Sequence, residues 1–235
     1  DFLATRLQQD DWSLKSLHRL IMLSSTYQMS SAWNENYAES DPENKLLWRM
    51  NRRRLEAEEI RDSLLAVGDN LDRRMGGSLL PTKNRAYVTS TANIDIKVYD
   101  TRRRSLYLPV VRSALYSVFQ VFDFAEPSII VGRRDVTTVP AQALFLLNSP
   151  FILKQSDHMA RQILASSSDD AGRVARAYSM TLARPPTTRE STTAIALVKD
   201  HLASLPGQTT DGDRQRAWSS LCQALISANR FIYVD

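Results

Sequence analysis

Cysteine is nearly absent from this chain of 235 residues, in which Cys222 is the only one. A disulfide, a thiolate metal cluster and a Cys-x-x-Cys-His haem attachment site all need at least two cysteines. The sequence therefore excludes an internal disulfide and haem attached in that way, and we expect no cofactor in this chain. Cys222 follows Leu221 on an apolar stretch, which is typical of a buried and unreactive thiol.

Glycine is also scarce, and long apolar runs are missing. The chain has 7 glycines, about 3% of its residues against a usual value of ~7%, so we expect few tight turns and no glycine-rich phosphate loop. No segment reaches the roughly 18 consecutive apolar residues of a membrane helix, so no membrane span is predicted. The first residues lack the charged, apolar and small-residue regions of a signal peptide.

The charges do not form blocks of one sign. The 30 basic and 26 acidic residues leave a formal charge of +4, and the arginines are interleaved with acids. Nucleic-acid binding favours clustered positive charge, so we expect no nucleic-acid partner. A hydrophobic content of 43% is enough for a substantial core.

Apolar residues recur with helical spacing through most of the chain. Ile60, Leu64, Val67 and Leu71 follow one another at steps of four, three and four, which predicts a helix that ends near Gly68. Similar patterns, caps and prolines predict further helices at about 14–27, 42–48, 141–147, 150–163, 171–182, 187–202 and 218–228. The fold class is therefore mainly α.

A β-rich excursion is expected between about residues 76 and 108. Glycines and a proline interrupt this stretch, and it has no helical stripe. The segments 87–89 and 94–99 read as short strands, and 105–108 reads as a third. The sequence predicts one helical domain with a small β-rich part. An alternative division near residue 136 separates helices plus the β excursion (1–135) from a helical bundle (136–235).

The run from 51 to 62 contains four arginines and four acids around an apolar stripe. Glu56 lies one helical turn before Ile60 and would share its buried face. A buried carboxylate is costly unless an arginine neutralises it. We therefore expect a network in this region that is either an anion-binding site or a set of structural ion pairs. Its candidate residues are Arg52, Arg53, Glu56, Glu59, Arg103, Arg104, Asp123, Arg133 and Arg134.

The structural role is favoured over the anion site, because buried acids generally find basic partners. Arginine forks at 102–104 and 133–134 would otherwise suit a carboxylate, sulfate or phosphate. No metal site is predicted, since His18, His158 and His201 are scattered along the chain.

Several phrases in a fixed order resemble a known family. They are Trp12-Ser13-Leu14-Lys15-Ser16-Leu17-His18-Arg19-Leu20-Ile21, Ser25-Thr26-Tyr27-Gln28, Asp41-Pro42-Glu43-Asn44, Arg52-Arg53-Arg54-Leu55-Glu56-Ala57-Glu58, Pro140-Ala141-Gln142-Ala143-Leu144-Phe145-Leu146-Leu147-Asn148, Leu221-Cys222-Gln223-Ala224-Leu225 and Phe231-Ile232-Tyr233-Val234-Asp235. Together they resemble the planctomycete PSD-type family, domain of unknown function fifteen-fifty-three.

The resemblance covers nearly the whole chain and carries expectations about its context. It implies a C-terminal module cut from a large exported protein, periplasmic or at the cell surface. Upstream domains, often including a cytochrome-c-like domain, would be its partners. The family offers no established catalytic residues to carry over.

The leading hypothesis is a non-catalytic structural or interaction module. The alternatives are a part of an enzyme, either a polysaccharide-directed hydrolase or a redox subunit served by haem, and a carbohydrate-binding module. An exposed cleft lined by Glu56, Glu59 and arginines would favour the enzyme, and burial of the same residues would favour the module. Carbohydrate is a candidate partner because aromatic residues at 33, 37, 87 and 99 fall in polar stretches, although anchoring of loops explains them more simply.

Overall fold

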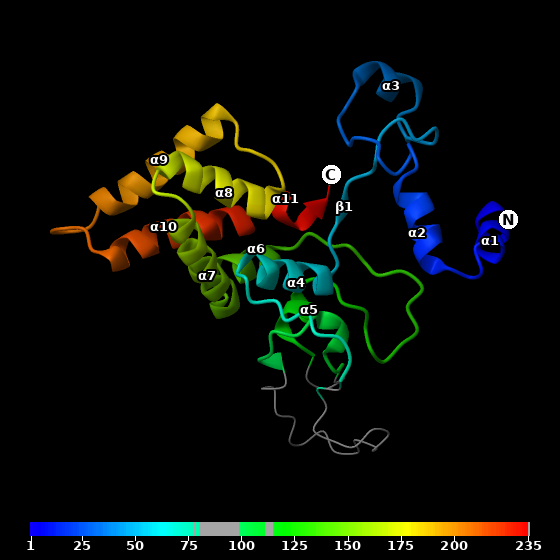
Figure 1. Cartoon of the computed structure of the whole chain (residues 1–235), viewed down its shortest axis with the longest axis horizontal. Coiled ribbons are helices and arrows are strands. Elements are labelled where there is room, and N and C mark those ends of the chain that lie inside the picture. The colour runs from blue at the N-terminus through cyan, green and yellow to red at the C-terminus, as the bar shows by residue number, and fades with distance from the viewer. Residues whose placement is uncertain (78, 80–98, 111–114, 235) are drawn as a thin grey trace. The chain divides into compact units, whose positions relative to one another are not determined.

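The computed structural model describes residues 1–77, 79, 99–110 and 115–234. Most of these residues are helical (Figure 1). The helices are α1 (Phe2–Gln9), α2 (Leu14–Met22), α3 (Glu35–Ser40), α4 (Ala57–Val67), η2 (Ser105–Tyr107, a 3-10 helix), α5 (Ser117–Val121), α6 (Pro140–Asn148), α7 (Pro150–Ser166), α8 (Asp170–Leu182), α9 (Thr188–Ala203), α10 (Asp211–Ile226) and α11 (Asn229–Ile232). Strands β1 (Arg53–Arg54) and β2 (Tyr233–Val234) pair as a two-stranded antiparallel sheet. The expected mainly α fold class is confirmed.

The chain forms two compact units. One consists of Asp1–Arg53 with Tyr233–Asp235, and the other of Arg54–Ile232. The division lies within β1, and residues on both sides of position 136 belong to the same unit. We call the two units the N-terminal unit and the main unit.

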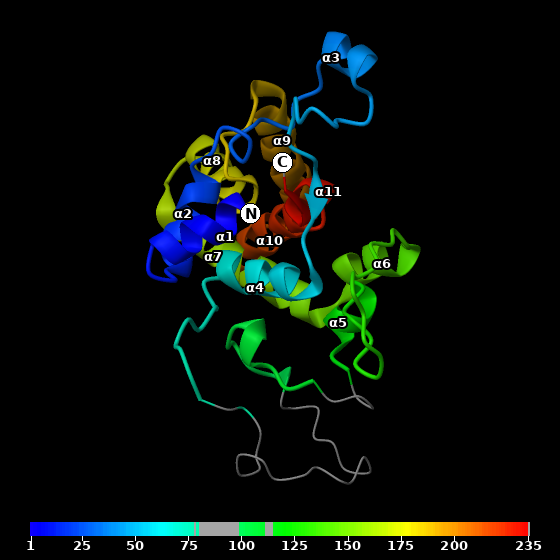
Figure 2. The same cartoon turned by 90° about the vertical axis from the view of Figure 1, so that its right-hand side faces the viewer.

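The core of the main unit lies among α7, α8, α9 and α10, which pack against one another (Figure 2). The residues of α7 expected to face inward, Ile152, Met159 and Ile163, are all fully buried, and Trp218 of α10 is 1% exposed. Leu197 of α9 was expected on the apolar face, but it is 43% exposed, so this prediction was wrong. A step of three instead of four residues from Ala194 carries Leu197 past the buried stripe, and Val198 fills the core position.

Caps fix the start of several helices of the main unit. The expected capping box of Thr187 and Glu190 is present at α9, and a second box at α10 joins Thr210 to Asp213. Pro140 and Pro150 occupy the first helical positions of α6 and α7, as expected from their preset backbone geometry. These local signals explain why the helix boundaries in this half follow the sequence closely.

The C-terminal strip folds back onto the protein. Phe231 and Ile232 of α11 are 7% and 6% exposed, and α11 packs on α8 and α10. The Leu55 amide donates to the Ile232 carbonyl at 2.8 Å. The buried side chains hold α11 on α8 and α10, and the backbone bond connects it to the segment that precedes α4.

The segment that follows α4 returns to that helix. Asp72 and Arg103 form an isolated parallel bridge, and the Asp72 amide donates to the Arg102 carbonyl at 2.8 Å. The strand expected at 105–108 is wrong, because Ser105–Tyr107 form η2. Asp62 accepts bonds from both the amide and the hydroxyl of Ser105, which favours a turn over an extended strand. Of the other expected strands, 87–89 and 94–99, only Tyr99 is among the described residues, and it is not in a strand.

The N-terminal unit contains α1, α2 and α3. Ser13 caps α2 as expected, but α2 ends at Met22 instead of near residue 27. The Ser24 hydroxyl donates to the Ile21 carbonyl and accepts from the Tyr27 amide, so a side-chain turn replaces the helical ladder.

The helix expected from residue 42 is also wrong. The Asp41 carboxylate accepts from the amides of Lys45 and Leu46, and Asn44 adopts a positive φ of 55°. The Asn44 side chain then bonds the Arg49 carbonyl at 2.8 Å. These bonds define a compact loop, because asparagine and aspartate side chains compete for the backbone groups that a helix would use.

Candidate functional site

Glu56 does not lie on the buried face of α4. It is the N-cap residue, and α4 begins at Ala57. Its side chain is 52% exposed and forms a capping box with Glu59, whose carboxylate accepts from the Glu56 amide at 2.9 Å. The expected buried position came from extending the helix back by one turn. A carboxylate at the cap satisfies helix amides instead of entering the core.

Arg134 reaches the same end of α4 from the loop that precedes α6. Its guanidinium binds both oxygens of Glu58, at 2.6 and 2.8 Å, and approaches Glu56 at 3.0 Å. Hydrogen bonding to Glu58 raises the pKa of Arg134. The guanidinium also lies 4.9 Å from the centre of the Phe124 ring. This bidentate pair attaches the loop to α4, and its acid is Glu58, which was not among the candidate residues.

Asp123 belongs to a second network, whose arginine is Arg54. Arg54 donates to Asp123 at 2.6 Å and also binds the Thr137 carbonyl. Thr137 donates its amide and hydroxyl to the same carboxylate at 2.9 and 2.8 Å. Partial burial acts to raise the pKa of Asp123, but the bonds from Arg54 and Thr137 outweigh it and lower that pKa below the ordinary value.

Arg61 is the most deeply buried charge in the described residues, with an exposed fraction of zero. It donates to the carbonyls of Thr101 and Arg103, at 2.5 and 2.9 Å, and lies 5.6 Å from the centre of the Tyr116 ring. Arg61 thereby holds the 101–105 segment on α4. Sequence reasoning did not select it, although its spacing of four residues from both Ala57 and Leu65 places it on their buried face.

The remaining candidates are Arg52, Arg53, Arg103, Arg104 and Arg133. Arg103 donates to the carbonyls of Arg74 and Gly76 and stacks on Tyr107, with its guanidinium 4.4 Å from the ring centre. Arg104 and Arg133 are exposed. Arg52 and Arg53 are exposed residues of the N-terminal unit. Within the main unit, the predicted cluster is therefore divided between the Arg134–Glu58 pair, the Arg54–Asp123 network and Arg103, which binds backbone carbonyls.

An open hollow of about 700 Å³ lies beside α4. Its acidic lining is Glu56, Glu58, Glu59 and Asp62, facing Arg104 and the apolar residues Leu106, Phe119 and Phe124. Glu58 is paired with Arg134, Glu56 and Glu59 cap α4, and Asp62 accepts from Ser105. The carboxylates are therefore exposed to a hollow, and each already takes part in a structural bond.

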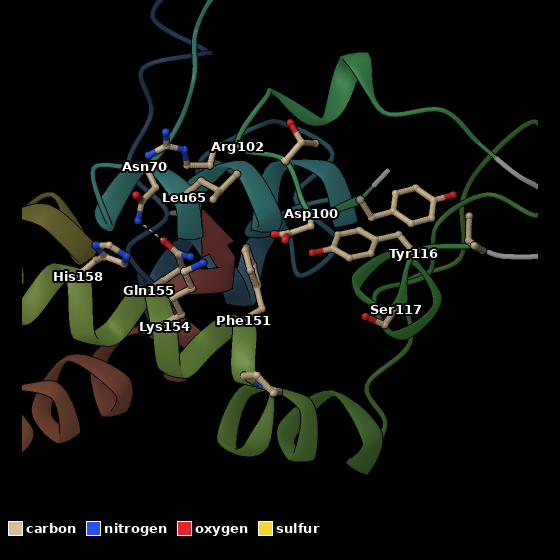
Figure 3. Close-up of a pocket in the computed structure, with 14 residues that line it drawn as sticks. Leu65, Asn70, Asp100, Arg102, Tyr116, Ser117, Phe151, Lys154, Gln155 and His158 are labelled. Atoms are coloured by element: carbon tan, nitrogen blue, oxygen red, sulfur yellow. Dashed lines mark hydrogen bonds between the residues drawn. The ribbon is translucent and has the colours of Figure 1, made fainter. Parts of the chain in front are cut away.

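A second cavity, of about 770 Å³, lies on the other side of α4. Figure 3 shows Lys154, Gln155 and His158 rising from α7 toward Asn70 and Arg102. Asp100, Tyr116 and Phe151 line the rest of the space. Of the residues that sequence reasoning considered, Tyr99, Arg102, Pro150 and His158 line this cavity. The sequence gives no signal that they meet, because they come from separate segments.

Burial dominates the chemistry of the single thiol. Cys222 is fully buried, and burial raises the pKa of its thiol to about 12. The expected buried position is confirmed, and the thiol stays protonated near neutral pH. Within the described ranges there is no group of three or more His, Cys, Asp or Glu side chains that could hold a metal ion. No helix among the same residues is long and apolar enough to cross a membrane.

Comparison with known proteins identifies a family. A family model described as PSD1, protein of unknown function (DUF1553), matches residues 1–198. No curated protein and no solved structure matches the chain.

Proposed function

The chain belongs to the PSD1 family of proteins of unknown function (DUF1553), and within it we propose that the chain is a non-catalytic interaction module of an exported multidomain protein. Its partner would be an upstream domain of the same protein, for which a cytochrome-c-like domain is the candidate. The main unit would supply a stable scaffold, and the N-terminal unit would supply the contact surface.

The observation that carries this proposal is the apolar surface of the N-terminal unit. Neither α1 nor α2 has a buried residue. The large apolar side chains of this segment include Phe2, Trp12, Leu14 and Leu23, which are 71%, 69%, 60% and 67% exposed. Removing apolar surface from water is favourable, so a partner that covers these side chains would be bound more tightly. Large exposed apolar patches accordingly mark interaction sites.

The carboxylates of the 56–62 run support a non-catalytic role. A general acid or base must be free to exchange a proton with substrate. Glu58 is instead held by both nitrogens of a guanidinium, and Glu56 and Glu59 satisfy backbone amides at the start of α4. Attachment of the 123–137 loop therefore accounts for the geometry of Glu58, and capping of α4 accounts for that of Glu56 and Glu59.

The test uses the parent protein with a protease site introduced between the upstream part and this chain. We expect the cleaved halves to elute together in size-exclusion chromatography. Leu14→Ser in α2 should separate them, because it places a hydroxyl in the apolar contact. Leu197→Ser in α9 is the matched control, since Leu197 is an exposed helical leucine of the main unit, and it should leave the halves together.

Two results would contradict the proposal. Halves that separate without any substitution would show that no stable contact exists. A large drop in the melting temperature of the isolated chain on Leu14→Ser would show that this face contributes to folding of the chain itself.

An enzyme part is the second candidate, and the open hollow beside Glu56 and Glu59 favours it. Glu59→Gln keeps the size of the side chain and removes its charge. If the chain or its parent hydrolyses a polysaccharide, or passes electrons to or from haem, and Glu59→Gln abolishes this without lowering stability, the carboxylates act in catalysis. Unchanged turnover in Glu59→Gln would show that these carboxylates are structural.

A carbohydrate-binding module is the third candidate, because two aromatic residues are exposed on the loop around α3. Trp33 and Tyr37 are 62% and 58% exposed, and both rings contact Trp48. Exposed aromatic faces can stack on sugar rings. Retarded migration in a polysaccharide gel that is lost in Trp33→Ala and kept in Trp12→Ala would support this role. Equal migration in all gels would exclude it for the polysaccharides used.

A further inference from the structure

We propose that the cavity between α4 and α7 binds a small organic anion, in which a carboxylate, sulfate or phosphate group is carried on a ring. This site is separate from the contact surface proposed above and does not depend on it. Its walls come from the C-terminal end of α4, the 99–102 segment, the start of α5 and the first half of α7 (Figure 3). A volume of about 770 Å³ is within the usual range of small-molecule sites.

The polar end of the cavity carries positive charge. Arg102 and Lys154 line it together with His158, and among the lining residues that the structure describes Asp100 is the one carboxylate. Among the residues that the structure describes, Arg102, Lys154 and His158 have no ion pair or side-chain hydrogen bond. Arg54 and Arg134, in contrast, are each held by a carboxylate. Two unpaired cations and one carboxylate leave a site that favours an anion.

A buried amide lies beneath these cations. Gln155 is 3% exposed, and its carbonyl oxygen Oε1 accepts from Asn70 Nδ2 at 2.9 Å. In the described part of the chain, its Nε2 group has no hydrogen-bond partner. Gly68 leaves room for this side chain, because a Cβ at position 68 would collide with Oε1. With Oε1 occupied, the Nε2 group remains as a donor that a bound oxyanion can accept from.

The other end of the cavity suits a ring. Phe151 and Tyr116 line it, and Tyr116 stacks on Tyr99 with ring centres 5.1 Å apart. Tyr99 is 5% exposed and Arg61 contacts the Tyr116 ring from the protein side, so this wall is held in place. An aromatic wall next to a cationic end matches a ring with one acidic substituent. Asp100 can accept a hydrogen bond from a hydroxyl group of the ligand.

The experiment titrates the whole chain with three probes in isothermal calorimetry: glucuronate, benzoate and inorganic sulfate. We expect saturable binding of one ring-bearing acid and weaker binding of sulfate. Arg102→Gln with Lys154→Gln should lower that affinity by roughly tenfold or more, the effect of losing a charged hydrogen bond. Phe151→Ala should lower the affinity for the ring-bearing acid and leave the affinity for sulfate unchanged.

The matched control is Arg176→Gln with Lys199→Gln, which makes the same charge change at exposed positions of α8 and α9. Binding that falls equally in both double variants would show attraction to net charge only and would overturn the proposal. Absence of saturable binding for all three probes would overturn it as well. Thermal unfolding of each variant checks that the cavity is intact, and the surface positions of Arg102 and Lys154 make these variants fold-neutral. Preference for glucuronate over benzoate, or the reverse, identifies the ring as a sugar or an aromatic.

Discussion

The two units of this protein use their apolar residues in opposite ways. The main unit buries the apolar faces of α7, α8 and α10, including Trp218 at 1% exposure. The N-terminal unit leaves Trp12 at 69% exposure, and Ala38 is the buried apolar residue among its described positions. Both have helices with caps and amphipathic patterns, so helix formation alone does not create a core. The difference teaches that a correct helical pattern predicts a surface to be covered but does not identify what covers it.

Replacing one tryptophan in each unit gives the largest expected contrast. Trp218→Ala should lower the free energy of unfolding by about 3–5 kcal/mol, because it leaves a cavity in the core. Trp12→Ala should change it by less than about 0.5 kcal/mol. Urea unfolding followed by circular dichroism measures both. Similar losses would mean that Trp12 is part of a core, and the contrast between the units would fail.

A pair of arginine variants sharpens the contrast for charged residues. Arg61→Met keeps an unbranched apolar stem at a buried position and removes the donors for the Thr101 and Arg103 carbonyls. A buried acceptor left without a donor costs about 1–3 kcal/mol, so we expect a loss of that order for each carbonyl. Arg19→Met, at an exposed position of α2, should be near neutral.

Thermal unfolding of the two variants provides the measurement. If Arg61→Met is as stable as the original chain, apolar packing compensates for the lost bonds, as happens at some buried ion pairs. The 101–105 segment would then be held on α4 by other contacts.

Much of the main unit could be predicted from the sequence, because its signals are local. The Thr187–Glu190 box, Pro140 and Pro150 act within one helical turn, and the structure places helix starts at each. The loop at Asp41–Arg49 could not be predicted in this way. Its conformation depends on Asn44 bonding the Arg49 carbonyl, a contact that competes with a helix and leaves no periodic pattern.

The candidate site was harder to predict for a related reason. Sequence proximity selected Arg52 and Arg53, whereas Arg54 reaches Asp123, 69 positions along the chain. The cavity that contains Lys154 and Gln155 depends on segments that meet only after folding. Composition identified the residue types, but the choice of partners is a tertiary property.

The Asp123 network should make the stability of the main unit depend on pH. The pKa of Asp123 is lower in the folded protein than its ordinary value of 3.8, so its contribution is present above that value and is lost as the pH falls through the folded pKa. Asp123→Asn should cost about 1.5–3 kcal/mol at pH 7, the usual size of a charged hydrogen bond. Asparagine also tolerates the positive φ of 57° at this position.

Urea unfolding at pH 7, 5 and 3 tests this dependence. The difference between the original chain and Asp123→Asn should be constant between pH 7 and 5 and shrink at pH 3. Asp135→Asn is the control, since Asp135 is exposed in the same loop, and it should show a small difference at every pH. A difference for Asp123→Asn that does not shrink would mean that the lost bonds do not depend on the charge.

The smallest loss of stability is expected at Glu56. The structure lowers the loss expected there from that of a buried ion pair to that of a helix cap. A buried Glu56 in an ion-pair network would cost about 3–5 kcal/mol on substitution by alanine. As an N-cap with a side chain 52% exposed, it should cost about 0.5–2 kcal/mol. Glu39→Ala, at an exposed position within α3, is the control and should be near neutral. Urea unfolding separates the cases: a loss above about 3 kcal/mol would place Glu56 in a buried network, and no loss would show that Glu58 alone holds Arg134 and that the cap contributes nothing.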